Sequence, residues 1–191
     1  VTAVAVSHDS RLIAASLKPE EWGPAVVTIR EARSGEDVFT RLVGRGEVGD
    51  LVFSRDNKRL WICWLHGGVG VLDLASREVH VLVTGHRVHS LAVSPDERLL
   101  GVGTSDGSIL IVDAATGETR SRFTGHTAWV ASLSFHPTLP ELASASTDKT
   151  VRLWNLDTGE CRAVLDGHWE KVYATAYSPD GRTLATGSND T

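Results

Sequence analysis

The sequence predicts an all-β protein built from repeated units of about 40 residues, each with four short antiparallel strands. Two landmarks establish the repeat. The first is a Gly-His pair, at Gly85-His86, Gly125-His126 and Gly167-His168, with spacings of 40 and 42 residues. The second is a turn of the Ser-Pro-Asp type, which recurs with a similar period. Two landmarks with one period are typical of stacked supersecondary units and argue against a single mixed core.

Each unit opens with a run of Val, Leu and aromatic residues that predicts a first strand. In the last three units these runs cover residues 88–93, 130–135 and 172–177. A turn follows, as in Ser94-Pro95-Asp96, because proline and aspartate favour turn geometry. The second strand then occupies residues 99–102, 142–145 and 184–185.

The third and fourth strands are separated by further turns of polar residues and glycine. Turns such as Thr147-Asp148-Lys149 lead into third strands at residues 109–112 and 151–154. Turns such as Thr158-Gly159-Glu160 lead into fourth strands at residues 120–123 and 161–165. No long stretch of the sequence has helical periodicity. Four-stranded units with this period predict a β-propeller, with blades at residues 1–43, 44–84, 85–124, 125–166 and 167–191.

The fourth unit carries the clearest signature. It has Gly125-His126 near its start, Asp148 in its third turn and Trp154-Asn155 at the end of its third strand. These residues resemble the WD-repeat family, and the resemblance extends in weaker form over the whole chain. It implies a propeller of seven blades, of which about four and a half are visible. The fifth blade ends after its second strand, and folded proteins normally cover such a sheet edge. We therefore expect an incomplete ring, completed by the rest of a longer chain or by another chain.

Composition narrows the class of protein. The chain has 191 residues, 41% of them hydrophobic, and a formal net charge of −5. This charge gives no electrostatic basis for binding nucleic acid, and no apolar run is long enough to span a membrane. Cys63 and Cys161 lie in different units, which argues against a disulfide scaffold. We expect two buried free thiols in a cytoplasmic protein.

The fourth unit also places His126, Ser144 and Asp148 at separations that imitate a catalytic triad. The family resemblance implies a different role, a buried hydrogen-bonded tetrad of these three residues with Trp154. Recurrence in several units favours this structural interpretation, because a nucleophile is needed once and a structural link is needed in every blade. The sequence therefore predicts no catalytic residue, and we expect a protein that is not an enzyme.

The tetrad is less complete in the other units. The fifth unit has His168, Thr186 and Asp190. The third unit keeps His86 and Asp106 but has valines at the Ser and Trp positions. Its loop after the Gly-His pair is two residues shorter, which predicts a weak or absent link between His86 and Asp106. At the His, Ser, Asp and Trp positions the second unit has Arg45, Ile62, His66 and Leu72 instead.

No metal or cofactor site is predicted. The eight histidines are scattered, and no Cys-x-x-Cys or His-Glu-x-x-His spacing occurs. The run Gly67-Gly68-Val69-Gly70 is rich in glycine, but neither Lys-Ser nor Lys-Thr follows it. A β-hairpin turn explains it better than a phosphate-binding loop.

Candidate partner-binding residues lie where the sequence departs from the repeat. In the resembling fold the Gly-His loops share one rim, and the residues that flank the start of each first strand face outward there. On this sequence the candidates at the rim are Arg87, His89, Trp129, Lys171 and Tyr173. For Trp129 the alternative is that it packs under its own loop, and we expect Trp169 to pack in its loop. Trp61 and Trp64 are expected in the core.

An insertion at residues 17–25 replaces the usual short turn of the first unit and carries Trp22. Insertions in repeat proteins map to loops on one face, often the binding face. Trp22 is therefore either an exposed anchor for a partner or a cover over the first blade.

The sequence leaves three hypotheses for function. The leading one is a non-catalytic scaffold that presents propeller loops to a protein or peptide. The second is a sensor or regulatory domain that packs on a fused effector domain. The third, an enzyme or small-ligand domain using the central channel, needs converging polar residues at the inner ends of the first strands. The sequence has mainly Ala, Val and Ser there.

Overall fold

The computed structural model describes residues 2–17, 23–65 and 67–190. Over these ranges the regular secondary structure is antiparallel β-sheet without a helix, which confirms the predicted fold class. Consequently, no helix that could cross a membrane is found in the described part of the chain. The chain divides into two compact units, residues 1–88 and 89–191.

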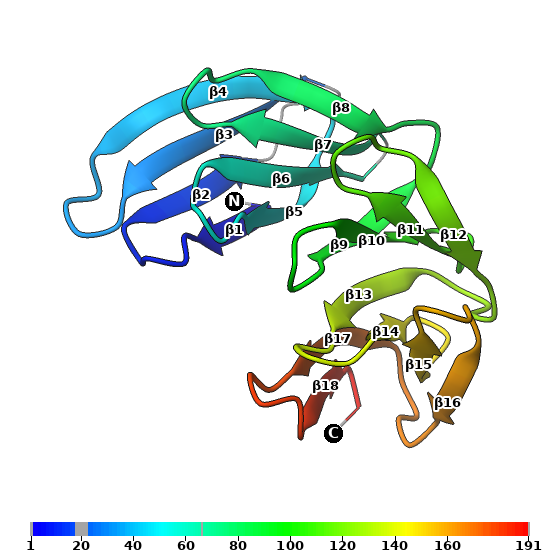
Figure 1. The fold of residues 1–191 in the computed structure, drawn as a ribbon. Helices are drawn as coiled ribbons and strands as arrows, with labels where there is room; N and C mark the ends of the chain where they lie inside the picture. Colours follow the sequence, from blue (N-terminus) through cyan, green and yellow to red (C-terminus); the bar gives the residue numbers. More distant parts are fainter. Residues whose placement is uncertain (1, 18–22, 66, 191) are drawn as a thin grey trace. The chain divides into compact units, whose positions relative to one another are not determined.

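The first unit contains two four-stranded sheets in which the strands pair in chain order (Figure 1). One sheet is formed by β1 (Ala3–Val6), β2 (Leu12–Leu17), β3 (Pro24–Glu31) and β4 (Asp37–Arg45). The other is formed by β5 (Val48–Phe53), β6 (Arg59–Trp64), β7 (Gly68–Asp73) and β8 (Val79–Val83). β4 extends past residue 43, where we expected the first blade to end. It does so because the long β3 pairs with it as far as Arg45.

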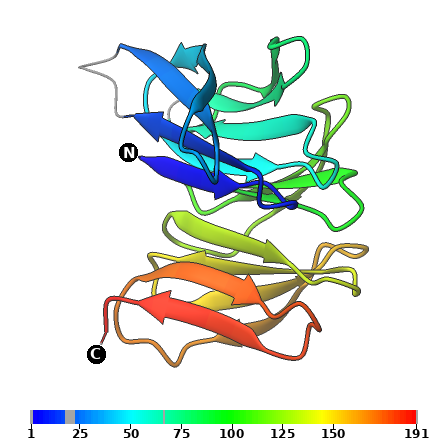
Figure 2. The same ribbon diagram turned by 90° about the vertical axis from the view of Figure 1, so that its left-hand side faces the viewer.

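The second unit repeats the arrangement and ends with a two-stranded sheet. The third sheet comprises β9 (Val88–Val93), β10 (Leu99–Thr104), β11 (Ile109–Asp113) and β12 (Thr119–Phe123). The fourth comprises β13 (Val130–Phe135), β14 (Glu141–Ser146), β15 (Val151–Asn155) and β16 (Cys161–Leu165). The fifth pairs β17 (Val172–Tyr177) with β18 (Leu184–Ser188), the orange and red strands of Figure 2. The three predicted first strands have the predicted bounds, whereas the second strands run longer.

Two tryptophans of β6, Trp61 and Trp64, are buried in the first unit, as predicted. The ring of Trp64 passes close to Gly44 on β4 and Gly70 on β7, where a Cβ would lie 3.0 and 2.6 Å from ring atoms. Residues without a side chain on both strands therefore make room for the indole, which joins the core of the unit.

The same local turn follows the first strand in most sheets. In the third sheet the hydroxyl of Ser94 donates to Asp96 Oδ1 at 2.7 Å, and the N–H of Leu99 donates to Ser94 Oγ at 2.9 Å. Glu97 takes a left-handed conformation with φ of 59°. The pairs Ser7–Asp9, Ser54–Asp56 and Ser178–Asp180 make the same side-chain hydrogen bond. This shared geometry explains why the Ser-x-Asp landmark recurs with the repeat.

The fourth sheet replaces this serine with His136, which also links it to the fifth sheet. His136 Nδ1 accepts from the backbone N–H groups of Thr138 and Leu139, at 3.2 and 2.9 Å. Its Nε2 donates to the carbonyl of Gly181 at 3.2 Å, and Tyr177 packs edge-on against its ring. The Tyr177 hydroxyl donates to Glu141 at 2.6 Å. Burial and this carboxylate raise the pKa of Tyr177, so the phenol stays protonated.

The prediction for the cysteines is right for one and wrong for the other. Cys63 is buried, and burial raises the pKa of its thiol. Cys161 is exposed, because it begins β16, the outermost strand of its sheet. Both are free thiols.

Gly103 on β10 lies against the neighbouring sheet, where the Ser90 hydroxyl donates to the Val130 carbonyl at 2.9 Å. A Cβ at position 103 would lie 2.3 Å from Ser90 Oγ and 2.8 Å from the Val130 carbonyl oxygen. Gly103→Ala should therefore lower the free energy of unfolding by about 1–3 kcal/mol in chemical denaturation.

Gly101→Ala on the same strand is the matched control. Its Cβ would meet its nearest neighbour at 3.4 Å, an ordinary contact distance, so a smaller loss is expected. Equal losses at the two glycines would contradict this account of the contact between the sheets.

Candidate functional site

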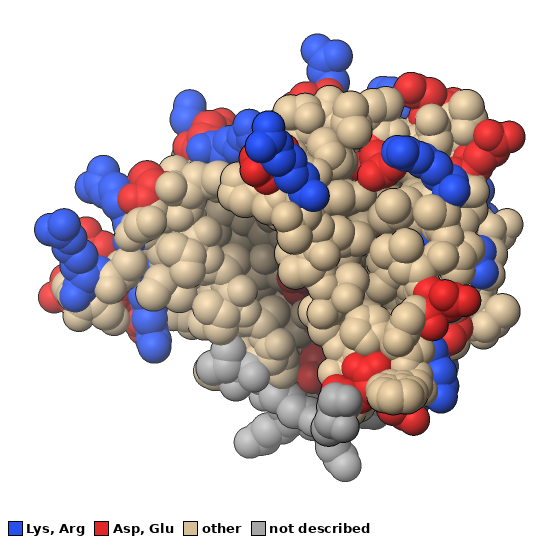
Figure 3. Space-filling view, turned by 90° about the horizontal axis from the view of Figure 1, so that it is seen from below, with Lys and Arg blue, Asp and Glu red and all other residues tan. Residues whose placement is uncertain are grey.

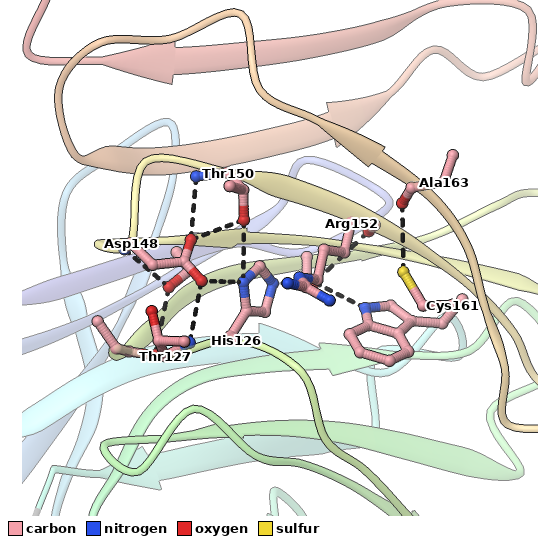
Figure 4. Close-up of polar contacts among 11 residues, drawn as sticks. His126, Thr127, Asp148, Thr150, Arg152, Cys161 and Ala163 are labelled. Atoms are coloured by element: carbon pink, nitrogen blue, oxygen red, sulfur yellow. Dashed lines mark hydrogen bonds and ion pairs between the residues drawn. The ribbon is translucent and has the colours of Figure 1, made fainter.

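The fourth sheet holds its four signature side chains in one hydrogen-bonded chain (Figure 4). His126 Nδ1 lies 2.8 Å from Asp148 Oδ2, and His126 Nε2 lies 2.7 Å from Ser144 Oγ. Trp154 Nε1 donates to Ser144 Oγ at 2.8 Å. The four residues come from the loop before β13, from β14, from the turn after it and from β15. The chain of bonds therefore ties these four elements together.

The partners fix the direction of each hydrogen bond. Since an ionised Asp148 can only accept, His126 Nδ1 carries the proton and Nε2 accepts from the Ser144 hydroxyl. The serine oxygen in turn accepts from the indole N–H of Trp154. Each polar atom of this buried chain has a partner of the right type, which is the arrangement expected of a structural network.

The ionised carboxylate of Asp148 is stabilised by several donors. It accepts hydrogen bonds from His126, from the backbone N–H of Thr127, and from the N–H and hydroxyl of Thr150. Burial by itself raises the pKa of Asp148, but the bonds from Thr150 and His126 outweigh it and lower that pKa to about 2. Burial lowers the pKa of His126 below its usual 6.5, and Asp148 offsets only part of this effect.

The structure explains the glycine that precedes His126. Gly125 has φ of +156°, and a Cβ there would lie 2.6 Å from a guanidinium nitrogen of Arg152 and 3.2 Å from the Trp154 ring. The loop thus crosses directly over these two side chains of β15. The Nε of Arg152 is buried and has no hydrogen-bond partner in the described structure. Its positive charge contributes to the lowered pKa of His126.

A catalytic role for this constellation fits the geometry poorly. Ser144 is 0% exposed, and the His126 side chain is equally covered. A substrate therefore has no route to the serine oxygen, which is already engaged by two neighbours. Within the described ranges, no cluster of three or more His, Cys, Asp or Glu side chains is arranged to hold a metal ion.

The other sheets form the network to different extents. In the fifth, His168 Nδ1 lies 3.0 Å from Asp190 and Nε2 lies 2.8 Å from Thr186 Oγ1. In the third sheet, His86 and Asp106 are both described, and no hydrogen bond joins them. Arg122 of β12 instead binds the Asp106 carboxylate at 2.8 Å. The shorter loop leaves His86 short of the turn, so Asp106 is neutralised from the outer strand.

The second sheet has apolar residues in place of this network. Ile62 and Leu72 are fully buried at the Ser and Trp positions. His66 and the side chain of Arg45, the other two positions, lie outside the described residues, as does Trp22 in the insertion.

Two predicted rim residues from neighbouring sheets stack on each other. The rings of His89 and Trp129 have centroids 4.6 Å apart and planes within 7°. His89 Nε2 lies 3.0 Å from the hydroxyl of Ser105, and this hydrogen bond restrains the orientation of the imidazole. Trp129 remains 52% exposed. Trp129 therefore rests on His89 of the preceding sheet with about half of its surface open to solvent, and it does not pack under its own loop.

The expectation for Trp169 is wrong. Its side chain is 73% exposed, the largest exposed fraction among the large hydrophobic residues described. The loop is instead held through its backbone, because Trp169 N–H donates to Asp190 at 2.9 Å and Lys149 Nζ donates to the Trp169 carbonyl at 2.7 Å. Sequence reasoning missed this contact because Lys149 belongs to the preceding repeat.

The remaining candidates are also at the surface. Lys171 and Tyr173 are exposed at the start of β17, and Arg87 is exposed just before β9. On the face shown in Figure 3, Lys and Arg side chains are interspersed with Asp and Glu, and neither sign dominates. Among the rim candidates, Trp129 and Tyr173 are large hydrophobic residues that are 52% and 45% exposed.

Comparison with known proteins identifies the family. The family model described as WD domain, G-beta repeat matches residues 76–113, 117–155 and 159–191. The chain belongs to the WD-repeat family. Its sheets are the blades of a WD-repeat β-propeller. Each matched repeat begins at the outer strand of one blade and continues into the next blade, so that residues 159–191 cover β16 together with β17 and β18.

Two relatives are similar to half of the chain. WD repeat-containing protein 90 of Mus musculus is 32% identical over 97 residues, and the protein of that name from Homo sapiens is 31% identical over 97 residues. The match covers 50% of this chain but only 5% and 6% of those proteins. Proteins of the WD-repeat family are generally protein-interaction scaffolds.

The two turn aspartates of the third and fourth blades differ in burial, which allows a direct comparison. The Asp148 side chain is 6% exposed and that of Asp106 is 59% exposed. Asp148→Ala should lower the free energy of unfolding by about 1–3 kcal/mol, because it leaves buried donors without an acceptor. Asp106→Ala should cost less, and equal losses in denaturant melts would contradict this ranking.

The tetrad should also make stability depend on pH. Since folding lowers the pKa of His126, the unfolded chain takes up a proton first as the pH falls below 6.5. The contribution of His126 to stability is therefore present at neutral pH and is lost as the pH falls toward the folded pKa. Asp148 acts in a lower window, between its usual value of 3.8 and about 2.

His126→Gln should flatten the decline of unfolding free energy between about pH 7 and 5, measured by denaturant melts at several pH values. An unchanged slope in the variant would show that other groups produce the decline.

Proposed function

We propose that this chain is a non-catalytic interaction module that binds a protein or peptide segment at the rim formed by the Gly-His loops of its second unit. The stacked pair of Trp129 and His89 carries this proposal. Trp129 presents half of a large apolar ring to solvent while its other face is fixed by a neighbouring blade. The WD-repeat family is generally used for such interactions.

The energetic argument rests on preorganisation. A partner that covers a mobile tryptophan must first immobilise it, which costs about 0.5–1.5 kcal/mol for a flexible side chain. Here the orientation of the Trp129 ring is already set by stacking on His89, which is itself held by the Ser105 hydroxyl. More of the apolar contact energy then appears as affinity. Tryptophan is one of the residue types enriched among binding hot spots.

The surroundings of Trp129 fit an extended partner. Trp169 and Tyr173 are exposed on the next blade. Lys149 lies between the two blades, bound to the Trp169 carbonyl and 3.7 Å from Glu170. The rim thus offers separate aromatic contacts on successive blades, a spacing that suits a segment of chain better than a small molecule.

Photocrosslinking tests the proposal on the full protein. A benzophenone side chain at position 129 should capture a protein partner from the native extract, and the same group at position 38 should not capture it. Val38 is a suitable control because it is 50% exposed near the start of β4, in the first sheet, which carries none of the five rim candidates. The captured partner is then used for affinity measurements.

Trp129→Ala should weaken binding of that partner at least about tenfold, with little change in the thermal melting temperature. Val38→Ala, the matched control at a similarly exposed position of the first sheet, should leave the affinity unchanged. Equal affinity of both variants for the partner would show that the rim is not part of the binding site.

A further inference from the structure

We propose that the second unit has another binding site, a groove at the opposite end of its third and fourth blades, which takes an extended peptide carrying an aliphatic residue beside an arginine or lysine. The site is independent of the rim, because the groove is built from the turns at the far ends of β9 and β13. Its volume is about 510 Å³, within the range typical of ligand-binding clefts.

The groove has an apolar lining. Leu99, Ile111, Phe135 and Leu156 line it from the two blades, and Leu139 adds a further apolar side chain. Leu139 is 52% exposed even though it is a large aliphatic residue on a turn. The lining therefore offers contact area to the aliphatic part of a ligand.

The turn that carries Leu139 is held in place before any ligand arrives. His136 accepts hydrogen bonds from the N–H groups of Thr138 and Leu139, and its other nitrogen bonds the Gly181 carbonyl of the fifth blade. An exposed leucine on a turn fixed from three directions resembles the arrangement of Trp129 on the rim. In both cases an apolar side chain is oriented but not covered.

The polar character of the groove selects the charge of the ligand. Pro95, Pro137 and Pro140 line it and have no N–H to donate, and the N–H groups of Thr138 and Leu139 are already used by His136. The backbone of these walls therefore offers few free N–H donors. A ligand that itself supplies donors fits this surface better than one that supplies acceptors.

The ionisable groups point the same way. The carboxylate of Asp157 is exposed and makes no ion pair with any residue that the structure describes. Asp96 accepts hydrogen bonds from Ser94 and from the Arg98 N–H through Oδ1, and its Oδ2 forms only a loose ion pair with the Arg98 side chain, at 4.0 Å. The cation of the lining, Arg120, is engaged by Asp113. An added Arg or Lys side chain would find acceptors in Asp96 and Asp157, and its aliphatic stem would cover the leucines.

The test is a selection of random linear peptides displayed on phage, performed on the full protein and counter-selected on Leu139→Glu. The peptides that depend on the groove should be enriched in Leu, Ile or Met next to Arg or Lys. Because position 139 is exposed, the variant should fold, and its thermal melt checks this. Leu139→Ser serves as a second, uncharged counter-selection.

Synthetic versions of the selected peptides then bind the purified variants. Asp157→Lys should weaken binding about tenfold or more, while Glu160→Lys, with the same change of charge on the same turn, should have less effect. Trp129→Ala should leave this affinity unchanged, which separates the groove from the rim.

The proposal is overturned if no peptide depends on Leu139, if the dependent peptides are acidic, or if the two lysine variants weaken binding equally. Failure of the rim proposal would leave these results unaffected, because the selection and the variants address only the groove.

Discussion

The buried carboxylate of Asp148 sets the geometry of the fourth blade. A charge in that position is costly unless donors surround it, and here the donors come from the loop before β13 and from the turn before β15. His126 passes the restraint through the blade to Trp154, whose ring packs against Phe123 of the neighbouring blade. The loop that Asp148 fixes is also the loop that carries Trp129. The exposed anchor of the proposed binding rim therefore depends on a buried ion.

The third and fifth blades show that the same turn can be held by different chemistry. Asp190 retains a histidine partner, whereas Asp106 uses Arg122 from the outer strand of its own blade. A buried histidine restrains a loop, while a surface arginine restrains mainly the turn and the strand it comes from. Exposed ion pairs are also weak. Among the described residues, the third blade therefore lacks the histidine–aspartate hydrogen bond found in the two blades that follow.

Much of the fold could be predicted because each strand and turn recurs with one period. The strands 88–93, 130–135 and 172–177 have the predicted bounds. Features made by two repeats together could not be predicted. The stacking of His89 on Trp129 joins positions that are not equivalent in the repeat, and the backbone carbonyl of Trp169 is bound by Lys149 of the preceding repeat. The role of His136 could not be predicted, because in the sequence its turn looks like a weaker copy of the Ser-x-Asp turn. Only the structure shows that its ring bonds the carbonyl of Gly181.

The offset between sequence repeat and blade has an evolutionary consequence. Since one repeat supplies the outer strand of the preceding blade and the first strands of the next, as in residues 159–191, a tandem duplication does not add an independent sheet. Each new copy supplies the outer strand of the preceding blade, and its own blade is completed by the outer strand of the copy that follows. Copy number can therefore change by recombination within coding sequence while neighbouring blades remain covalently interlocked. Individual repeats are then free to diverge at the loops, as Trp129 and Lys171 have done at one equivalent position.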